Sequence, residues 1–269
     1  MAQKYGTSEE IAIKMMLEQV KTNDRKRALF FREIDNIKVL NHPNIVKFKG
    51  RGYSSNIFFF TMEYCDRGTV LDLMQCKGKP LTVDEAIPII FDVLDALDYA
   101  HNAKIPYVKL QDGSYGEGKG IVHRDIKPKN ILLKTVNNQT VAKLSDFGLA
   151  KAFDQAGFSG VTMTGVNVEG SFNFMSKGQF INFKYPKPEM DVWSTVATLY
   201  YMLTGRYPKD FNGRDPMLTV LQTKALPIHE YNQNIPHKLA NLIDFALIDD
   251  PQIHFKNAIA FKNALKSLI

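Results

Sequence analysis

The sequence predicts an α+β fold in which short strands come first and helices follow. Ile11 to Lys14 and Ile57 to Phe60 are apolar, β-rich segments of strand length. After Thr82, apolar residues recur at helical spacing. The segment from Asp191 to Leu203 is apolar on almost every side, which is typical of a buried central helix. A chain of 269 residues can bury a large core, as one domain or as two lobes.

Composition and charge restrict the class of protein. The net charge of +6 is spread along the chain, which favours a mild attraction for nucleotides or acidic surfaces and no nucleic-acid site. Cys65 and Cys76 are too few for a disulfide framework or a zinc site, so we expect free thiols. No apolar run approaches the roughly 20 residues of a membrane helix, and residues 1–10 lack the apolar core of a signal peptide. We therefore expect a cytoplasmic protein without a membrane segment.

The first strand ends in Lys14, a residue that at a strand end usually extends into solvent. Residues 25–40 are predicted to form a helix that carries Glu33. Because a buried lysine needs a partner, we expect an ion pair between Lys14 and Glu33. Pro43 should end this helix, since the residue before a proline avoids the helical conformation.

The second half begins with a long amphipathic helix. Thr82 and Glu85 have the spacing of a capping box at its start. Pro88 removes one backbone hydrogen bond, so we expect a kink or a later start there. The stretch from His101 to Lys119 is rich in glycine, lysine and polar residues and is predicted to be a surface loop.

The functional signal is concentrated in residues 121–130, I-V-H-R-D-I-K-P-K-N, and in the D-F-G that begins at Asp146. Phosphoryl transfer from a nucleotide requires an acceptor for a hydroxyl proton, oxygen ligands for magnesium, and cations for developing charge. Asp125, Asn130, Asp146 and Lys127 supply these groups. Taken singly, an aspartate before a turn is usually a cap. Five residues at fixed offsets should arise by chance in roughly one such chain in ten thousand, so we favour the catalytic interpretation.

These motifs resemble the catalytic loop and metal-binding motif of the eukaryotic-type (Hanks-type) protein kinases, and Lys127 resembles the serine/threonine branch. The stretch before Lys119 resembles an insertion of some bacterial members. The resemblance implies a two-lobed protein-kinase-like fold, with a small antiparallel β-sheet lobe over residues 1–64 and a larger helical lobe over residues 65–269. It also implies transfer of the γ-phosphoryl group of ATP, with Mg2+, to serine or threonine hydroxyls of a protein substrate.

The same resemblance implies a role for each site residue. Asp125 would orient the incoming hydroxyl and accept its proton, and Lys127 would neutralise charge on the transferring group. Asn130 and Asp146 would bind magnesium. The Lys14–Glu33 pair would hold the α- and β-phosphates.

Adenine recognition is implied on the segment after the second strand. Met62 would be the gatekeeper, and the Glu63 carbonyl and Cys65 amide would bond the adenine edge. Ala12 and Leu132 would lie on opposite faces of the ring. An apolar column beneath it would consist of Ile37, Phe48, His123 and Phe147.

The sequence departs from the family in two places. A member begins with two strands joined by a glycine-rich loop, but this chain reaches Lys14 after thirteen residues and contains no G-x-G-x-x-G. The intact catalytic groups favour a kinase domain lacking its first strand or strands over a decayed enzyme. Ser176-Lys177-Gly178 replaces A-P-E, and His254 replaces the arginine partner of that glutamate. Because both ends of this buried ion pair are absent together, we interpret the change as compensated.

Residues 149–170 correspond to the activation segment and contain Ser159, Thr162 and Thr164. A phosphate on one of them could pair with Arg124 and order the segment. Residues 170–175, which include Ser171, resemble the segment that docks a protein substrate.

Two other functions stay open. The missing glycine-rich loop and the S-K-G triplet are compatible with a catalytically impaired pseudokinase that binds nucleotide, or with a scaffold module. A small-molecule phosphotransferase would share the aspartate and asparagine of the loop, but usually not Lys127 together with a peptide-docking segment. Flanking regulatory domains are compatible with all three functions.

Overall fold

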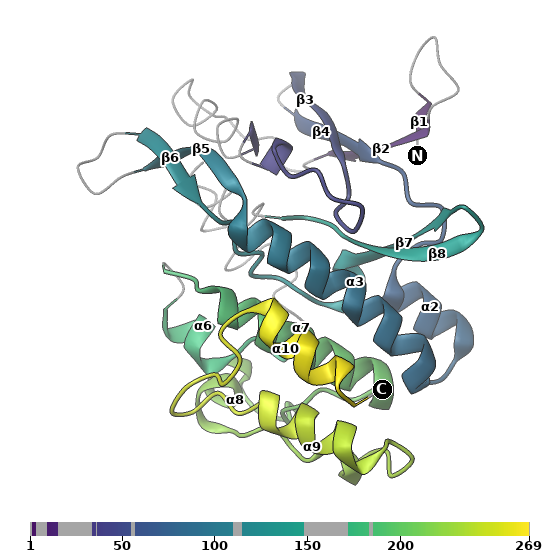
Figure 1. Ribbon diagram of the computed structural model, residues 1–269, viewed down its shortest axis with the longest axis vertical. Helices are drawn as coiled ribbons and strands as arrows, with labels where there is room; N and C mark the ends of the chain where they lie inside the picture. The colour runs from purple at the N-terminus through teal and green to yellow at the C-terminus, as the bar shows by residue number, and fades with distance from the viewer. Residues whose placement is uncertain are drawn as a thin grey trace.

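The computed structural model describes residues 2–3, 10–15, 34–35, 37–54, 57–109, 115–147, 172–182 and 185–268. It has the two expected lobes: a small antiparallel sheet above and a helical assembly below (Figure 1). The N-terminus lies in the sheet lobe and the C-terminus in the helical lobe. The α+β fold class is therefore confirmed.

Four strands form the sheet, in the order β1-β2-β4-β3, and their bounds are β1 Ala2–Gln3, β2 Glu10–Met15, β3 Phe48–Ser54 and β4 Ile57–Glu63. The lysine strand is β2, and its register sets Lys14 opposite Phe60 and Ala12 opposite Met62. The two-residue β1 pairs with β2, so a strand that the sequence analysis did not expect lies beside the lysine strand. In β3, a Cβ at Gly52 would lie 2.3 Å from the Phe59 ring, so glycine allows these two strands to approach.

The segment after the predicted helix of residues 25–40 connects the lobes. Of that helix the structure describes residues 34–35 and 37–40, and the helical conformation ends before Leu40, as Pro43 predicts. Val46 N–H then donates to the Leu144 carbonyl at 3.0 Å, and Leu144 N–H donates to the Asn44 carbonyl at 2.8 Å. The sheet lobe is thus hydrogen-bonded directly to strand β8.

Helix α3, Val83–Asn102, is the expected long helix. The Glu85 carboxylate accepts the Thr82 N–H at 3.0 Å, as a capping box requires. The expected late start is wrong, because the helix begins at Val83 and continues through Pro88. Only one backbone bond is lost at a proline, and the cap and the buried apolar face of α3 evidently outweigh that loss.

The surface loop expected up to Lys119 is wrong for residues 104–109 and 115–119, which form strands. Strands β5, Lys104–Lys109, and β6, Tyr115–Lys119, form an antiparallel hairpin that projects beside the sheet lobe (Figure 1). The glycines and lysines predicted a loop, but Ile105 pairs with Gly118 and Val108 with Gly116 across the two strands. Ile105, at 2% exposure, fixes the base of the hairpin in the core.

The helical lobe is built around α7, Pro188–Thr204, which confirms the buried central helix. From Met190 to Leu203 every residue except Tyr201 is buried, and the helix ends at Gly205 with φ 68°. Around it lie α3 and the other helices: α2 Val70–Lys77, α6 Lys177–Ile181, α8 Pro216–Gln222, α9 His237–Ala246 and α10 Ala258–Lys266. Among the described residues, none of the helices has the length and apolar character needed to cross a bilayer.

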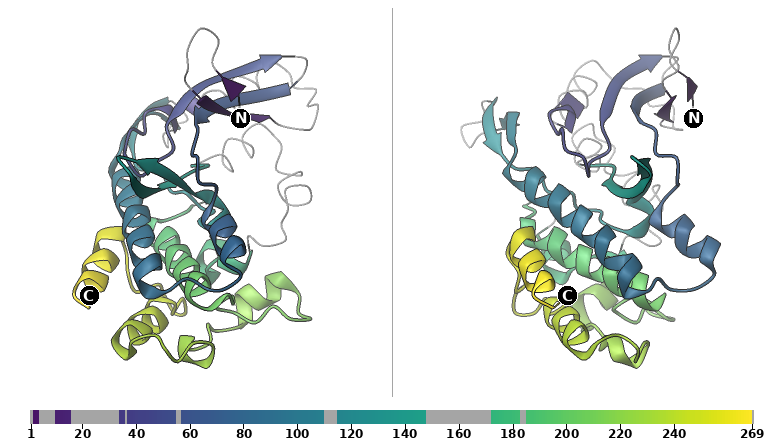
Figure 2. Two further views of the ribbon diagram at one scale, coloured as in Figure 1. Left: turned by 90° about the vertical axis from the view of Figure 1, so that its right-hand side faces the viewer. Right: turned by 45° about the vertical axis from the view of Figure 1, so that its right-hand side comes forward.

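The catalytic motifs lie between the lobes. A short 3-10 turn, η1 Pro128–Asn130, leads into the hairpin of β7, Ile131–Val136, and β8, Gln139–Leu144. Figure 2 shows this hairpin between the sheet and the helices. A second 3-10 turn, η2 Phe172–Phe174, precedes α6, and a third, η3 Ile228–Glu230, precedes α9.

Candidate active site

The backbone of the catalytic loop is fixed by Asp191, the fully buried aspartate in the first turn of α7. Its two carboxylate oxygens accept the His123 N–H at 2.7 Å and the Arg124 N–H at 2.8 Å. One oxygen also bonds the His101 ring at 2.8 Å. Burial alone would raise the pKa of Asp191, but the bond to His101, the nearby imidazoles and the Arg124 N–H hold it below its ordinary value. The backbone of the catalytic loop is therefore hydrogen-bonded to an ionised carboxylate.

Asp125, Lys127 and Asn130 converge as expected. Lys127 Nζ lies 2.8 Å from Asp125 Oδ2. The Asn130 amide nitrogen donates to the Asp125 backbone carbonyl at 2.7 Å and to its Oδ2 at 2.9 Å. Because both partners hold one carboxylate oxygen, the rotamer of Asp125 is set before any substrate binds.

Asn130 and Asp146 lie at the same end of the β7–β8 hairpin. The register sets Ile131 opposite Leu144, and Ser145 N–H donates to the Asn130 carbonyl at 2.9 Å. Asp146 adopts φ 63°, and His123 Nε2 donates to the preceding Ser145 carbonyl at 2.7 Å. The turn brings an amide oxygen and a carboxylate to one edge. Such hard oxygen ligands suit magnesium, which usually takes one or two carboxylates together with phosphates.

Lys14 reaches this edge from the sheet lobe. Its Nζ lies 2.6 Å from Asp146 Oδ2, and its side chain is 46% exposed. The partner that we expected, Glu33, lies outside the described residues. A lysine bonded to Asp146 lies where phosphates and a metal would meet, so the ion pair brings the two lobes together at the predicted site.

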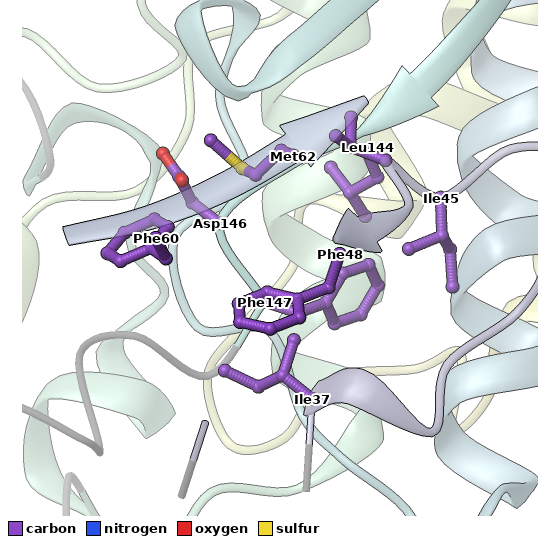
Figure 3. A pocket seen from close by; sticks show the side chains of 9 residues that line it. Ile37, Ile45, Phe48, Phe60, Met62, Leu144, Asp146 and Phe147 are labelled. Carbon is purple, nitrogen blue, oxygen red and sulfur yellow. The ribbon is translucent and has the colours of Figure 1, made fainter. Parts of the chain in front are cut away.

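A small apolar hollow of about 20 Å³ lies beside Asp146 and is lined by three members of the expected column, Ile37, Phe48 and Phe147. They gather beneath β4, the strand that carries Met62 (Figure 3). His123 packs edge-on against Phe147, with ring centroids 4.7 Å apart. The column is therefore continuous from the sheet lobe to the catalytic loop, and the aromatic ring of the D-F-G motif packs inside it.

This arrangement can be compared with known proteins. The sequence model of the protein kinase domain family matches residues 1–257 of this chain. The chain belongs to the protein kinase domain family. The family expected from the catalytic loop is thus confirmed.

Curated relatives include bacterial serine/threonine-protein kinases. A probable serine/threonine-protein kinase of Clostridium perfringens is 33% identical over 256 residues, which cover 92% of this chain and 33% of the relative. Serine/threonine-protein kinase PrkC of Bacillus subtilis is 30% identical over 253 residues, with coverages of 93% and 35%. The chain therefore spans about a third of the length of these relatives.

Solved kinase structures share the fold. The PknI kinase domain of Mycobacterium tuberculosis has a TM-score of 0.68 and 21% identity, and the match covers 99% of this chain and 89% of that chain. Rad53 1-466 in complex with AMP-PNP has a TM-score of 0.69 and 23% identity, with coverages of 96% and 58%. At such identities the likeness concerns the fold alone.

The segment that in a kinase binds adenine contains an interaction that the sequence analysis missed. The Glu63 carboxylate bonds Lys134 at 2.6 Å, lies 3.2 Å from Lys143, and accepts the Lys47 N–H at 3.1 Å. Burial would raise the pKa of Glu63, but these donors hold it below its ordinary value. The signal in the sequence was a pair of lysines in otherwise apolar strands. Glu63 thus joins the sheet lobe to the β7–β8 hairpin through its side chain.

Three residues expected around adenine flank this ion cluster. Ala12 lies on β2 opposite Met62, and Leu132 bridges to Thr69 at the start of α2. Cys65 is buried, and burial together with Glu63 raises the pKa of its thiol to about 11. A thiol that stays protonated offers little chemistry of its own, which agrees with a backbone role for this residue.

The two ends of the ion pair usual in kinases are Gly178 and His254 here, and other contacts form at or beside these positions. Lys177 N–H donates to Asp249 Oδ2 at 2.8 Å, and Lys177 Nζ donates to Asp250 Oδ2 at 2.6 Å. The His254 ring packs on Phe245, with centroids 4.1 Å apart. The compensated reading of the S-K-G triplet therefore has a structural basis, since α6 remains bonded to the loop after α9.

Several predicted positions lie outside the described residues: Glu33, Gly148, Ser159, Thr162, Thr164 and Ser171. A larger hollow, of about 560 Å³, lies away from the catalytic groups, between α2, α3 and the β7–β8 hairpin. Its carboxylates Asp72, Glu85 and Asp92 already accept backbone N–H groups, so we interpret them as structural.

Proposed function

We propose that this chain is an ATP-dependent serine/threonine protein kinase that transfers the γ-phosphoryl group of MgATP to a protein. The observation that carries the proposal is the meeting of Lys14, Asp146, Asn130 and Asp125 between the lobes. Family membership supports it, and so does the fact that the two bacterial relatives are named as serine/threonine-protein kinases. Rad53, a protein of the same fold, has a crystal structure in complex with the ATP analogue AMP-PNP. The two lobes would be residues 1–64 and 65–269, and the protein would act in the cytoplasm.

In this mechanism Asp125 orients the substrate hydroxyl for in-line attack and accepts its proton. Lys127, 2.8 Å from Asp125, stabilises charge on the transferring group. Asn130 and Asp146 would hold magnesium, which neutralises phosphate charge when bound. Lys14 would exchange its bond to Asp146 for one to the nucleotide phosphates.

Adenine would bind between Ala12 and Leu132. Its edge would bond the Glu63 carbonyl and the Cys65 amide. The Glu63 carboxylate, held by Lys134 and Lys143, would keep these backbone groups in place.

Asp125→Asn tests the proposal. Purified protein should incorporate phosphate from MgATP into a generic basic protein, and the substitution should lower kcat by about 10²- to 10⁴-fold, because it removes the proton acceptor. Binding of ATP should be unchanged. Asp84→Asn, at an exposed position of α3, is the matched control. Equal incorporation by wild type and Asp125→Asn would contradict the proposal.

The observation that favours a nucleotide-binding scaffold is the Lys14–Asp146 ion pair, which occupies both groups that would bind phosphate and metal. This alternative predicts that ATP raises the Tm while no phosphate is transferred to protein.

A further inference from the structure

Gln179 is a buried polar residue in the first turn of α6. Its N–H donates to the Ser176 hydroxyl that caps the helix, at 3.2 Å, and the residue is 3% exposed. Its side-chain nitrogen donates to the Arg124 backbone carbonyl at 2.7 Å. Its side-chain oxygen is buried and has no partner within the described part of the chain. Burying a side-chain amide with only one of its two polar atoms hydrogen-bonded costs free energy, and an apolar residue would fill the same space without that cost.

The accepting carbonyl belongs to the residue just before the catalytic aspartate. Arg124 adopts φ 74°, a left-handed conformation that costs an L-residue about 1–2 kcal/mol. Such a conformation persists only where its surroundings hold it. Asp191 holds the Arg124 N–H and Gln179 holds its carbonyl, so both backbone polar groups of Arg124 are bonded. That carbonyl belongs to the peptide group between Arg124 and Asp125.

Gln179 is held in turn by the contacts of Lys177, which precedes the Gly178 that stands in place of the usual kinase glutamate. The Lys177 N–H and Nζ bond Asp249 and Asp250. Asp249 also pairs at 3.0 Å with Lys209, which is buried and donates to the Val220 carbonyl. One chain of bonds therefore runs from the core of the helical lobe through α6 to the catalytic loop.

We propose that Gln179 is a positioning residue for phosphoryl transfer: through the Arg124 carbonyl it holds the Asp125 carboxylate in the orientation for hydroxyl attack, and Lys177 holds Gln179 there. This inference rests on the proposed kinase function. It connects α6, the helix that follows the proposed substrate-docking segment, to the proton acceptor Asp125 through the Arg124 carbonyl. Misplacement of the peptide plane before Asp125 should lower kcat and leave the KM for ATP nearly unchanged, because no nucleotide contact is altered.

The test uses two variants of similar size. Gln179→Met cannot donate a hydrogen bond, and Gln179→Glu can donate only when its carboxyl is protonated. At pH 8 both should lower kcat by about 10- to 100-fold. Burial raises the pKa of a carboxyl group, so kcat of Gln179→Glu should recover towards wild type as the pH falls to 6, relative to Gln179→Met. Gln75→Glu, exposed on α2, is the control and should match wild type.

Hydrogen exchange provides a readout that needs no turnover. Amides of residues 121–130 should exchange faster in both variants, while those of α3 should not change. Lys177→Met, at the outer end of the chain of bonds, should show the same pattern with a smaller effect. An inactive wild type whose loop still exchanges faster in the variants would contradict the kinase function but not the positioning role. The inference would be overturned if kcat and amide exchange were unchanged in both Gln179 variants. It would also be overturned if kcat fell equally at pH 6 and pH 8 while amides exchanged faster throughout the protein.

Discussion

The catalytic loop and the lysine strand meet at one ion pair but are held in different ways. On the helical side, the backbone around Asp125 is bonded to the buried groups Asp191 and Gln179. On the sheet side, no described residue of β2 is buried, and Lys14 is half exposed. The loop that carries Asp125 is therefore fixed by buried polar groups of the helical lobe. Lys14, which we propose binds phosphate, is exposed enough to change partners, as a ligand-binding side chain must be.

Asp191→Ala should have the largest effect on stability. The substitution leaves His101 and two backbone N–H groups without their buried partner, so the free energy of unfolding should fall by about 3–5 kcal/mol. Urea unfolding followed by circular dichroism measures this change. Asp84→Ala, exposed in α3, should change it by less than about 1 kcal/mol. A loss below that size for Asp191→Ala would break the contrast between the two sides.

Glu63→Gln should have an intermediate effect, because the carboxylate is 15% exposed and bonded to two lysines. We expect a loss of about 1–3 kcal/mol at pH 7. The pKa of Glu63 is lowered by folding, so its contribution is present above the ordinary pKa and is lost as the pH falls through the lowered value. The difference between wild type and variant should therefore shrink as the pH is lowered from 7 to 3. Glu117→Gln, exposed on β6, should show no such trend.

Lys14→Met should have the smallest effect on stability and a large one on activity. An ion pair of a half-exposed lysine contributes about 0.2–1 kcal/mol. Loss of a phosphate-binding cation should nevertheless lower kcat by about 10²- to 10³-fold. Thermal unfolding and phosphate incorporation, measured on one preparation, test both statements, with Lys38→Met as the control. If Lys14→Met cost as much stability as Asp191→Ala, the two sides would not differ in the way described.

Local patterns predicted most of the elements that surround the site. The cap before α3 and the apolar α7 follow from spacing alone, because a helix repeats every 3.6 residues wherever it lies. The β5–β6 hairpin was missed because its glycines and lysines resemble a loop, and only cross-strand pairing makes it a sheet. The side-chain role of Glu63 was missed because its lysine partners lie 71 and 80 positions further along the chain.

By itself, the sequence determined which chemical groups are present: a catalytic loop and a D-F-G motif whose acids, amide and lysine suit phosphoryl transfer. Tertiary structure alone decided what each group bonds: Lys14 pairs with Asp146, Lys177 bonds Asp250, and Gln179 bonds the Arg124 carbonyl across 55 positions. The physical reason is the difference in sequence separation between the residues that form a motif and the residues that form a tertiary contact. Motif identity depends on residues a few positions apart, but ion pairs and buried hydrogen bonds form between whichever polar groups the packed core brings together.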